Sequence, residues 1–167
     1  MDYDADFGEY AAARWRTLVR TGVLLGCSVV DAEDLAQQTL LRCYLKWASV
    51  ERAIDRAVYV ARLQSNLLRQ GRRRRWWGER PSDELPEPVS ADATTRVDDA
   101  DALMRALDRL PDTQRQAVVL GHYLHFTEQQ VAEATGVTRR TVKSRLSRAL
   151  TTLAAKPDLA ALRGGHR

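Results

Sequence analysis

Hydrophobic residues recur at intervals of three and four along most of the chain, the spacing of one face of an α-helix. Near the N-terminus this spacing is present at Phe7, Ala11, Trp15, Leu18 and, two turns further on, Leu25. No stretch shows the convincing alternation of apolar and polar residues that a half-buried strand would have. We therefore expect an all-α fold.

A second helix is predicted from about Ser28 to Trp47. Ser28 and Asp31 have the spacing of a capping box, with aspartate in place of the usual glutamate. The positions expected to face the core share the helical period: Leu35, Ala36, Thr39, Leu40, Cys43 and Trp47.

The opposite face of this second helix carries Asp34, Gln38, Leu41 and Leu45. Two leucines on an outer face indicate either an interface with another protein or packing against a further helix of the same small domain. The pattern by itself leaves both alternatives open.

A third helix is predicted from about Asp55 into the stretch "QGRRRRWWGERP", with Val60, Leu63 and Leu67 facing inward. The opposite side forms a basic stripe several turns long, with Asn66 on its flank: Arg62, Arg69, Arg72 and Arg73. Such a stripe is typical of a helix that holds a phosphate backbone, with the polar Asn66 near a base.

Trp76 and Trp77 follow the arginines directly. One alternative for this pair is stacking on unpaired bases, since an aromatic face accepts any base. The other is packing beneath the arginines as a hydrophobic plug, which we favour because large aromatic side chains gain most from burial.

The composition then changes. Residues 80–99, "RPSDELPEPVSADATTRVDD", contain three prolines, many acidic residues and few large apolar ones, which is typical of a flexible linker. An amphipathic helix is predicted over 101–110, Pro111 interrupts it, and another helix is predicted over 112–124. We therefore expect two small helical domains, 1–80 and 100–156, joined by an acidic linker over 81–99 and followed by a tail over 157–167.

Residues 127–150, "TEQQVAEATGVTRRTVKSRLSRAL", have the pattern of a helix-turn-helix. Thr127 and Gln130 form a capping box, and the small side chain of Ala132 allows the two helices to cross closely. Gly136 stands at the turn, where a positive φ is required, and Thr138 caps the second helix. The apolar stripe of that helix consists of Val142, Leu146, Ala149, Leu150 and Leu153.

The other face of this helix is basic and polar, as a major-groove helix requires. Arginine can read guanine bidentately, serine can donate to a base or a phosphate, and lysine neutralises phosphate. The alternative is a solvated basic helix in an ordinary bundle, which the turn glycine and the two caps make the weaker interpretation. The candidate DNA-contacting residues are Arg139, Arg140, Thr141, Lys143, Ser144, Ser147 and Arg148.

Charge supports two separate anion-binding elements. Residues 1–55 carry a net charge of −3, residues 56–80 carry +7, residues 81–112 carry −6 and residues 113–167 carry +6. One diffuse basic surface would not divide into two basic blocks with an acidic block between them. With 44% hydrophobic residues among its 167, the chain can also bury a core.

Several function classes are excluded or disfavoured. No apolar run is long enough to cross a bilayer, and the acidic first ten residues are unlike a secretory signal, so we expect a cytoplasmic protein without membrane insertion. Cys27 and Cys43 form no CxxC pair, which argues against a disulfide framework or a zinc site, and Cys43 is expected to be a reduced, buried thiol. The histidines form no evident triad or metal set, so we expect neither an enzyme nor a cofactor or metal: His122, His125 and His166.

Three segments together carry a family resemblance. "LPDTQRQAVVLGHYLHFTEQQVAEATGVTRRTVKSRLSRAL" resembles the C-terminal domain of extracytoplasmic-function (ECF) RNA polymerase sigma factors of the sigma-70 family. "DAEDLAQQTLLRCYLKW" is similar to the helix by which these factors dock on polymerase, and "AVYVARLQSNLLRQGRRRR" to the helix that opens and reads the −10 element. "WWGERPSDELPEP" resembles a subgroup common in high-GC Gram-positive bacteria, an actinobacterial type.

The resemblance implies a sigma-2-like domain followed by a sigma-4-like helix-turn-helix domain, with core RNA polymerase and promoter DNA as partners and an anti-sigma factor as a further candidate. It implies −35 contacts by the seven helix-turn-helix residues named above, −10 contacts by Arg62, Asn66, Arg69, Arg72 and Arg73, and polymerase contacts by Asp34, Gln37, Gln38, Leu41 and Leu45. The alternative function is a two-domain helix-turn-helix regulator that acts without sigma activity.

The predicted linker is long enough for this task. Its 19 residues span at most about 65 Å when extended. The promoter elements that the family implies are about seventeen base pairs apart, or about 58 Å along the duplex. The linker and its flanking domains can therefore bridge the two elements.

Overall fold

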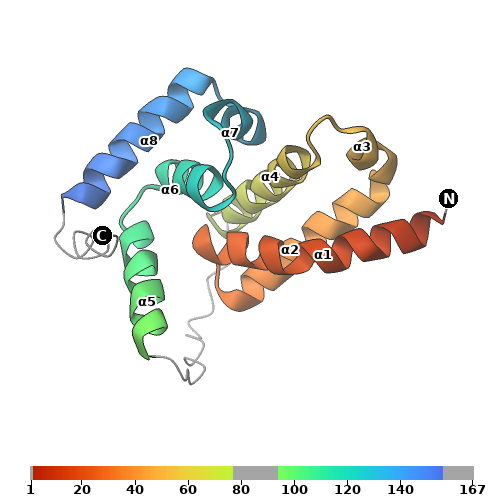
Figure 1. The fold of residues 1–167 in the computed structure, drawn as a ribbon, viewed down its shortest axis with the longest axis horizontal. Coiled ribbons are helices and arrows are strands. Elements are labelled where there is room, and N and C mark those ends of the chain that lie inside the picture. The colour runs from red at the N-terminus through yellow and green to blue at the C-terminus, as the bar shows by residue number, and fades with distance from the viewer. Residues whose placement is uncertain (1, 77–93, 156–167) are drawn as a thin grey trace, which may run out of the picture.

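The computed structural model describes residues 2–76 and 94–155, and every regular element in these ranges is helical (Figure 1). The all-α prediction is thereby confirmed. The first part contains α1 (Tyr3–Leu24), α2 (Val29–Leu45), α3 (Trp47–Arg52) and α4 (Arg56–Trp76). The second part contains α5 (Thr94–Asp108), α6 (Asp112–Val118), the π-helical turn η1 (Val119–Tyr123), α7 (Glu128–Thr135) and α8 (Arg139–Ala154).

The pair α1 and α2 is set by a cap and by a close backbone approach. The Ser28 hydroxyl accepts a hydrogen bond from the Asp31 amide at 3.1 Å, which confirms the predicted start of the second helix. Gly22 of α1 lies so close to Ala32 that an added Cβ would stand 3.0 Å from the alanine Cβ. The predicted core positions of α2 are buried or half-buried, with Ala36 and Cys43 fully enclosed.

An aromatic cluster lies where the N-terminal part of α1 meets the C-terminal end of α2. The helix that we predicted to end at Trp47 ends at Leu45, and Trp47 begins the short helix α3. Trp47 makes an edge-to-face contact with Phe7, with ring centroids 5.4 Å apart, and Arg56 of α4 lies over its ring. The cluster ties α1, α3 and α4 together. At the middle of α4, Gln64 Nε2 donates to the carbonyl of Leu18 at 2.8 Å.

The boundary of the predicted linker needs a correction. α5 begins at Thr94, so residues 94–99 are helical and not part of a flexible connection. These six residues contain neither proline nor glycine, so no strong helix breaker prevents an N-terminal extension of the helix over 101–110. Residues 81–93, Trp77 and the tail over 157–167 lie outside the described residues. So does the side chain of Trp76, and the prediction for the tryptophan pair stays a prediction.

The helix predicted over 112–124 changes its winding partway. The α-helix ends at Val118, and the following turn is π-helical, with the Leu124 amide donating to the Val119 carbonyl at 3.2 Å. His125 then takes a φ of 57°, and the Phe126 amide returns to the Leu120 carbonyl at 3.1 Å. The extra residue in this turn redirects the chain into α7.

The helix-turn-helix is confirmed in its local details. Thr127 and Gln130 form a reciprocal capping box, with bonds of 3.2 and 2.8 Å. Gly136 ends α7 with a φ of 71°, and the Thr138 hydroxyl caps α8. One stripe position was wrong: Leu150 is 51% exposed. The adjacent Ala149 is fully buried. Successive residues of an α-helix are rotated by about 100°, and this rotation places Leu150 on the solvent side.

The two parts of the chain pack against each other. α7 lies on α4, and α8 lies on α6 and α7 (Figure 1). Val58 and Ala61 of α4 share one buried cluster with Val131 and Ala132 of α7. Leu25, just after α1, belongs to a second cluster with side chains from α5 and α8. Two of the hydrophobic clusters therefore contain residues from both parts.

Candidate nucleic-acid interface

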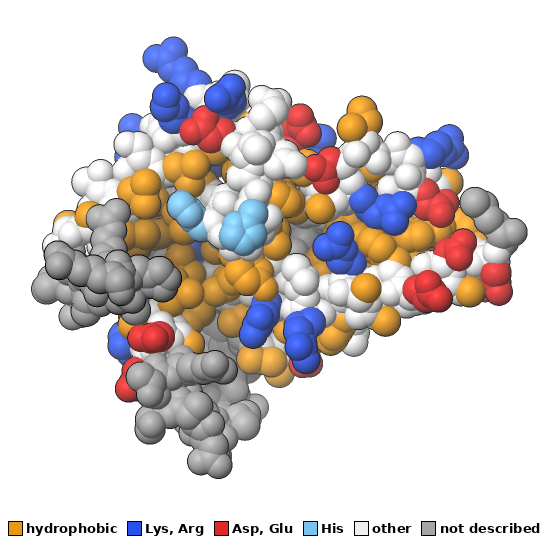
Figure 2. All heavy atoms as spheres, in the orientation of Figure 1, with side chains coloured by type: hydrophobic (Ala, Val, Ile, Leu, Met, Phe, Trp, Pro, Cys, Tyr) orange, Lys and Arg blue, Asp and Glu red, His pale blue; other side chains and the backbone are white. Residues whose placement is uncertain are grey.

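The basic face of α8 is open to solvent. Arg140, Lys143 and Arg148 are exposed, as are the two serines between them. Lysine and arginine side chains gather at the end of the molecule where α7 meets α8 (Figure 2). From Arg140 to Arg148 the helix rises about 12 Å, and the major groove of B-DNA is about 12 Å wide. A single helix can therefore present these side chains to base edges and phosphates together.

Two of the predicted residues on α8 also have structural roles. Arg139 is exposed, and its Nε forms an ion pair with Glu128 Oε2 at 3.2 Å, which ties the start of α8 to the start of α7. Thr141 is half-buried, and its hydroxyl lies 2.9 Å from that of Thr138. The ion pair joins the first turns of α7 and α8, whereas the hydroxyl contact lies within the cap of α8 itself.

The structure adds residues that the sequence analysis missed. Arg145 lines one hollow together with Arg140 and Arg148, and Thr113 and Gln114 of α6 complete its wall. Arg145 was not among the candidate residues because its helical position lies next to the apolar stripe and not opposite it. The two α6 residues lie about thirty positions away in sequence, so no local pattern connects them with α8.

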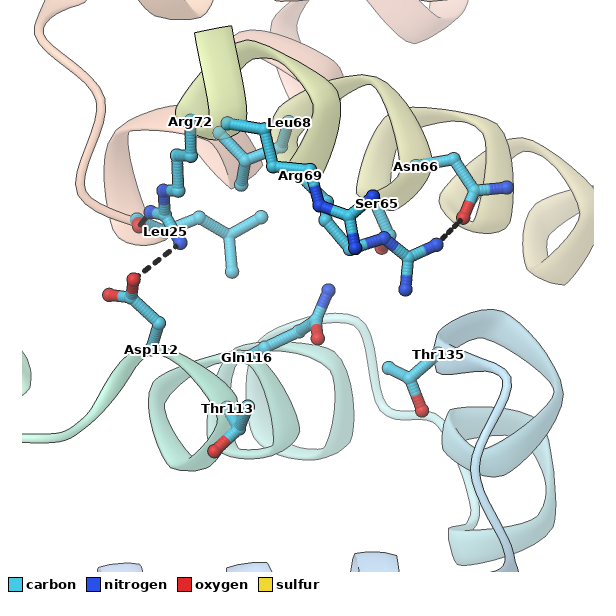
Figure 3. A pocket seen from close by; sticks show the side chains of 11 residues that line it. Leu25, Ser65, Asn66, Leu68, Arg69, Arg72, Asp112, Thr113, Gln116 and Thr135 are labelled. Atoms are coloured by element: carbon cyan, nitrogen blue, oxygen red, sulfur yellow. Dashed lines mark hydrogen bonds and ion pairs between the residues drawn. The ribbon is translucent and has the colours of Figure 1, made fainter. Parts of the chain in front are cut away.

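The basic stripe on α4 is also present as predicted. Arg62, Arg69 and Arg73 are exposed, and Asn66 is half-buried on their flank. Arg69 Nη2 donates to Asn66 Oδ1 at 2.6 Å, so the amide and the guanidinium form one polar group (Figure 3). The opposite face is directed inward, with Val60 buried and Leu63 and Leu67 half-buried.

Arg72 differs from its neighbours because its guanidinium has partners outside α4. Its Nη2 donates to the Leu25 carbonyl at 2.6 Å, and its Nη1 forms an ion pair with Asp112 Oδ2 at 3.1 Å (Figure 3). A cavity of about 320 Å³ opens beside this contact. Its walls come from both parts of the chain and include Asn66, Arg69, Arg72, Arg73, Thr113, Gln116 and Thr135.

The outer face of α2 is apolar and exposed. Leu41 is 57% and Leu45 is 68% exposed, whereas Leu35 on the inner face of the same helix is 7% exposed. The packing of these leucines against a further helix, one of the two alternatives from the sequence, is therefore not found among the described residues. Asp34, Gln37 and Gln38 are exposed on the same side, with Gln38 Nε2 donating to Asp34 Oδ2 at 2.7 Å.

Among residues 2–76 and 94–155, no group of three or more histidine, cysteine, aspartate or glutamate side chains could hold a metal ion. Cys43 is buried as predicted, and burial raises the pKa of its thiol to about 11, so the thiol is neutral at physiological pH. His122 and His125 are both exposed, and histidine side chains appear among hydrophobic and uncharged ones in Figure 2. No helix in the part of the chain that the structure describes is long and apolar enough to cross a membrane.

The described part of the chain combines a capped helix-turn-helix whose second helix is basic, a further basic helix, and a helix with an exposed apolar face. A helix-turn-helix with a basic second helix is typical of DNA-binding proteins. Known proteins place the chain more closely. The family described as Sigma-70, region 4 matches residues 100–153. The chain is 36% identical over 148 residues to the RNA polymerase sigma-E factor of Streptomyces coelicolor, covering 89% of this chain and 84% of that protein.

A further relative is the ECF RNA polymerase sigma factor SigM of Mycobacterium tuberculosis, 34% identical over 140 residues, which are 83% of this chain and 70% of that protein. The solved sigma factor RpoE of Bartonella quintana, in complex with the anti-sigma factor NepR, has a similar fold with a TM-score of 0.68. Its sequence identity is 24%, over 96% of this chain and 99% of that one. The chain belongs to the ECF family of RNA polymerase sigma factors.

Proposed function

We propose that this chain directs core RNA polymerase to promoters through three surfaces, one each on α2, α4 and α8. The observation that carries the proposal is the presence of two exposed basic helical faces on separate elements, together with an exposed apolar face on α2. A regulator that binds a single DNA site needs only one such basic helix. Two of them suit two promoter elements, and the leucines suit the polymerase.

α8 is proposed to read the −35 element. Arg140, Lys143 and Arg148 project from one side of a helix whose other side is fixed by Val142 and Ala149, both fully buried. Arginine forms two parallel hydrogen bonds with the major-groove edge of guanine, while lysine and serine contact phosphates. The neighbouring Arg145, Thr113 and Gln114 are proposed to extend the same contact surface toward the DNA backbone.

α4 is proposed to face the −10 element. Arg69 and Arg73 would hold phosphates, and the amide of Asn66, oriented by Arg69, would contact a base edge. Arg62 is exposed on the same side of α4, nearer its N-terminus, and would add a contact with the DNA backbone. The stripe is several turns long, so it can follow a strand that has left the duplex.

The outer face of α2 is proposed to dock on core polymerase. Two leucines more than half exposed on one helix gain free energy when a partner covers them, and Asp34, Gln37 and Gln38 supply the polar rim of such an interface. An anti-sigma factor is a further proposed partner, because a protein that covered these leucines would keep the chain from polymerase. The proposed activity is non-enzymatic and takes place where polymerase is, in the cytoplasm.

The experiment is run-off transcription with purified core polymerase, together with footprinting of the same promoter with and without core. A sigma factor should yield a specific transcript and should protect the promoter strongly only when core is present. Equally strong protection by the chain alone, without a transcript, would contradict the proposal. That result would favour a regulator that acts without sigma activity.

A further inference from the structure

The cavity beside the basic stripe of α4 has the size and shape of a site for a small molecule. Its volume is about 320 Å³, and small-molecule sites in proteins commonly measure about 300–1,000 Å³. α4 forms one wall, and α6 with the end of α7 forms the facing wall (Figure 3). A molecule in this space is contacted from two sides, whereas the exposed face of a single helix contacts its partner from one side only.

The α4 wall of the cavity is basic. Arg69, Arg72 and Arg73 line it, and Asp112 is the one carboxylate among the described lining residues. The Asp112 carboxylate is already paired with Arg72 at 3.1 Å. Among the described residues neither Arg69 nor Arg73 forms an ion pair, and these two guanidinium groups lie one helical turn apart, a spacing at which like charges repel. An anion in the cavity would relieve this repulsion.

The rest of the lining is uncharged. Leu25, which is 3% exposed, and Leu68 supply apolar surface. The side chain of Gln116 points from α6 toward α4, and Thr135 is the last residue of α7 (Figure 3). Arginine binds phosphate through parallel hydrogen bonds, whereas an amide or a hydroxyl exchanges hydrogen bonds with uncharged polar groups. The lining therefore suits a molecule with a phosphate end and an uncharged polar end.

We propose that this cavity binds a small molecule with a diphosphate group, and that this ligand competes with DNA for Arg69 and Arg73. The inference rests on the proposed function of α4, in which the same two arginines hold DNA phosphates. A diphosphate places one anionic group against each of these guanidinium groups. Gln116 and Thr135 face the same ligand from α6 and α7, outside the α4 face proposed to contact the −10 element, and they therefore distinguish the ligand site from the DNA site.

The first measurement is isothermal titration calorimetry of the full chain with ADP, GDP, inorganic pyrophosphate and adenosine, without divalent cations that would screen the phosphates. We expect the three diphosphates to bind and adenosine to give no signal. Tighter binding of ADP or GDP than of pyrophosphate would identify the ligand as a nucleoside diphosphate, and the reverse order would identify it as a free diphosphate.

Gln116→Glu tests the position of the ligand. The new carboxylate would face the phosphates across the cavity, so binding of each diphosphate should weaken at least about tenfold. The matched control is Gln129→Glu, which makes the same change at an exposed position of α7 outside the cavity and should match wild type. Circular dichroism reports the helix content of each variant. Arg69→Ala with Arg73→Ala, at exposed positions of α4, is the second variant and should abolish diphosphate binding.

The second measurement follows a fluorescein-labelled single-stranded DNA of mixed sequence by fluorescence anisotropy. ADP or pyrophosphate, whichever binds more tightly, is added at about ten times its Kd. DNA binding by the wild-type chain should then weaken at least about threefold, because only the ligand-free fraction binds DNA through α4. Without ligand, Gln116→Glu should bind DNA as wild type does, and the same ligand concentration should leave its DNA binding unchanged.

No binding of ADP, GDP or pyrophosphate at about 1 mM would overturn the ligand site. Adenosine binding as tight as that of ADP, or equal ligand binding by wild type and Gln116→Glu, would also refute it. Arg69→Ala with Arg73→Ala separates this inference from the proposed function. If the double variant lost DNA binding but kept diphosphate binding, the ligand site would be wrong and the −10 role would stand. If it lost diphosphate binding but kept DNA binding, the site would stand, and the −10 role and the competition would be wrong.

Discussion

At the scale of single residues, two glycines differ in backbone conformation but not in the space around them. A Cβ added to Gly8 or to Gly136 would meet nothing within 4 Å. Gly8 lies inside α1, whereas Gly136 ends α7 with a φ of 71°. Any difference between their alanine variants must therefore come from the backbone.

We expect Gly136→Ala to lower the free energy of unfolding by about 1–2 kcal/mol, because an L-residue is strained in the left-handed region. Gly8→Ala should raise it by about 0.5–1 kcal/mol, because alanine loses less backbone entropy in a helix than glycine. Urea unfolding followed by circular dichroism measures both. If Gly136→Ala also raised the free energy of unfolding, as Gly8→Ala is expected to, the turn at Gly136 would not need its positive φ.

Arg148 allows a test of base reading. It is exposed on α8 opposite the buried Val142 and Ala149 stripe. If it reads a guanine, Arg148→Ala should weaken polymerase-dependent promoter binding by about 1–3 kcal/mol and relax specificity at one base pair. Competition between promoters substituted at single positions of the −35 element measures this, with the exposed Arg105→Ala of α5 as the control. Equal losses on all promoters would assign Arg148 to a phosphate.

At the scale of an element, α2 presents two leucines to different surroundings. Leu41 is 57% exposed on the outer face, and Leu35 is 7% exposed on the inner face. We expect Leu41→Ala to weaken binding to core polymerase while the melting temperature stays close to that of wild type, since alanine is a strong helix former. Leu35→Ala should instead lower stability by about 2–5 kcal/mol.

The measurements are core affinity by fluorescence anisotropy and thermal unfolding of each variant alone. A large drop in melting temperature for Leu41→Ala with unchanged core affinity would show that the leucine stabilises the fold of the isolated chain. The polymerase interface would then have to lie on another face.

Element by element, the sequence predicted what local chemistry determines. The caps at Ser28 and Thr127 and the turn at Gly136 depend on residues within one helical turn, so their patterns were sufficient. The start of α5 was missed because the acidic, proline-containing composition was averaged over the whole stretch 80–99. The π-helical turn after Val118 was missed because the hydrophobic pattern up to Val118 is that of a regular α-helix. The extra residue of the π-helical turn changes the helical register only beyond this point.

At the scale of the whole molecule, the contacts between the two parts had no sequence signal. Arg72 was predicted as one of four equivalent arginines on a stripe, and Asp112 only as the start of a helix. Their ion pair joins residues 40 positions apart, and the Gln130 contact with Asp55 joins residues 75 positions apart. Periodicity assigns a residue to a face, but it does not assign the element that covers this face.

This distinction between the arginines changes how the role of α4 in DNA opening is tested. Arg72→Ala would remove a proposed DNA contact and also the contacts of Arg72 with Leu25 and Asp112, so the effect of this variant could not be assigned to either one. Arg69 and Arg73 are exposed on α4, and the hydrogen bond of Arg69 goes to Asn66 of the same helix. We therefore expect Arg69→Ala with Arg73→Ala to weaken open-complex formation with polymerase.

The same double variant should also make open-complex formation less dependent on salt. An arginine that contacts a phosphate releases counterions, so its removal flattens the log–log dependence by about 0.7 on single-stranded and about 0.9 on duplex DNA, or about 1.4–1.8 for two. Permanganate footprinting across a salt series measures both the yield and the slope. Arg16→Ala with Arg20→Ala, at exposed positions of α1, removes the same charge outside the proposed DNA faces. If both double variants behaved alike, the stripe on α4 would be a solvated surface, and strand opening would depend on other residues.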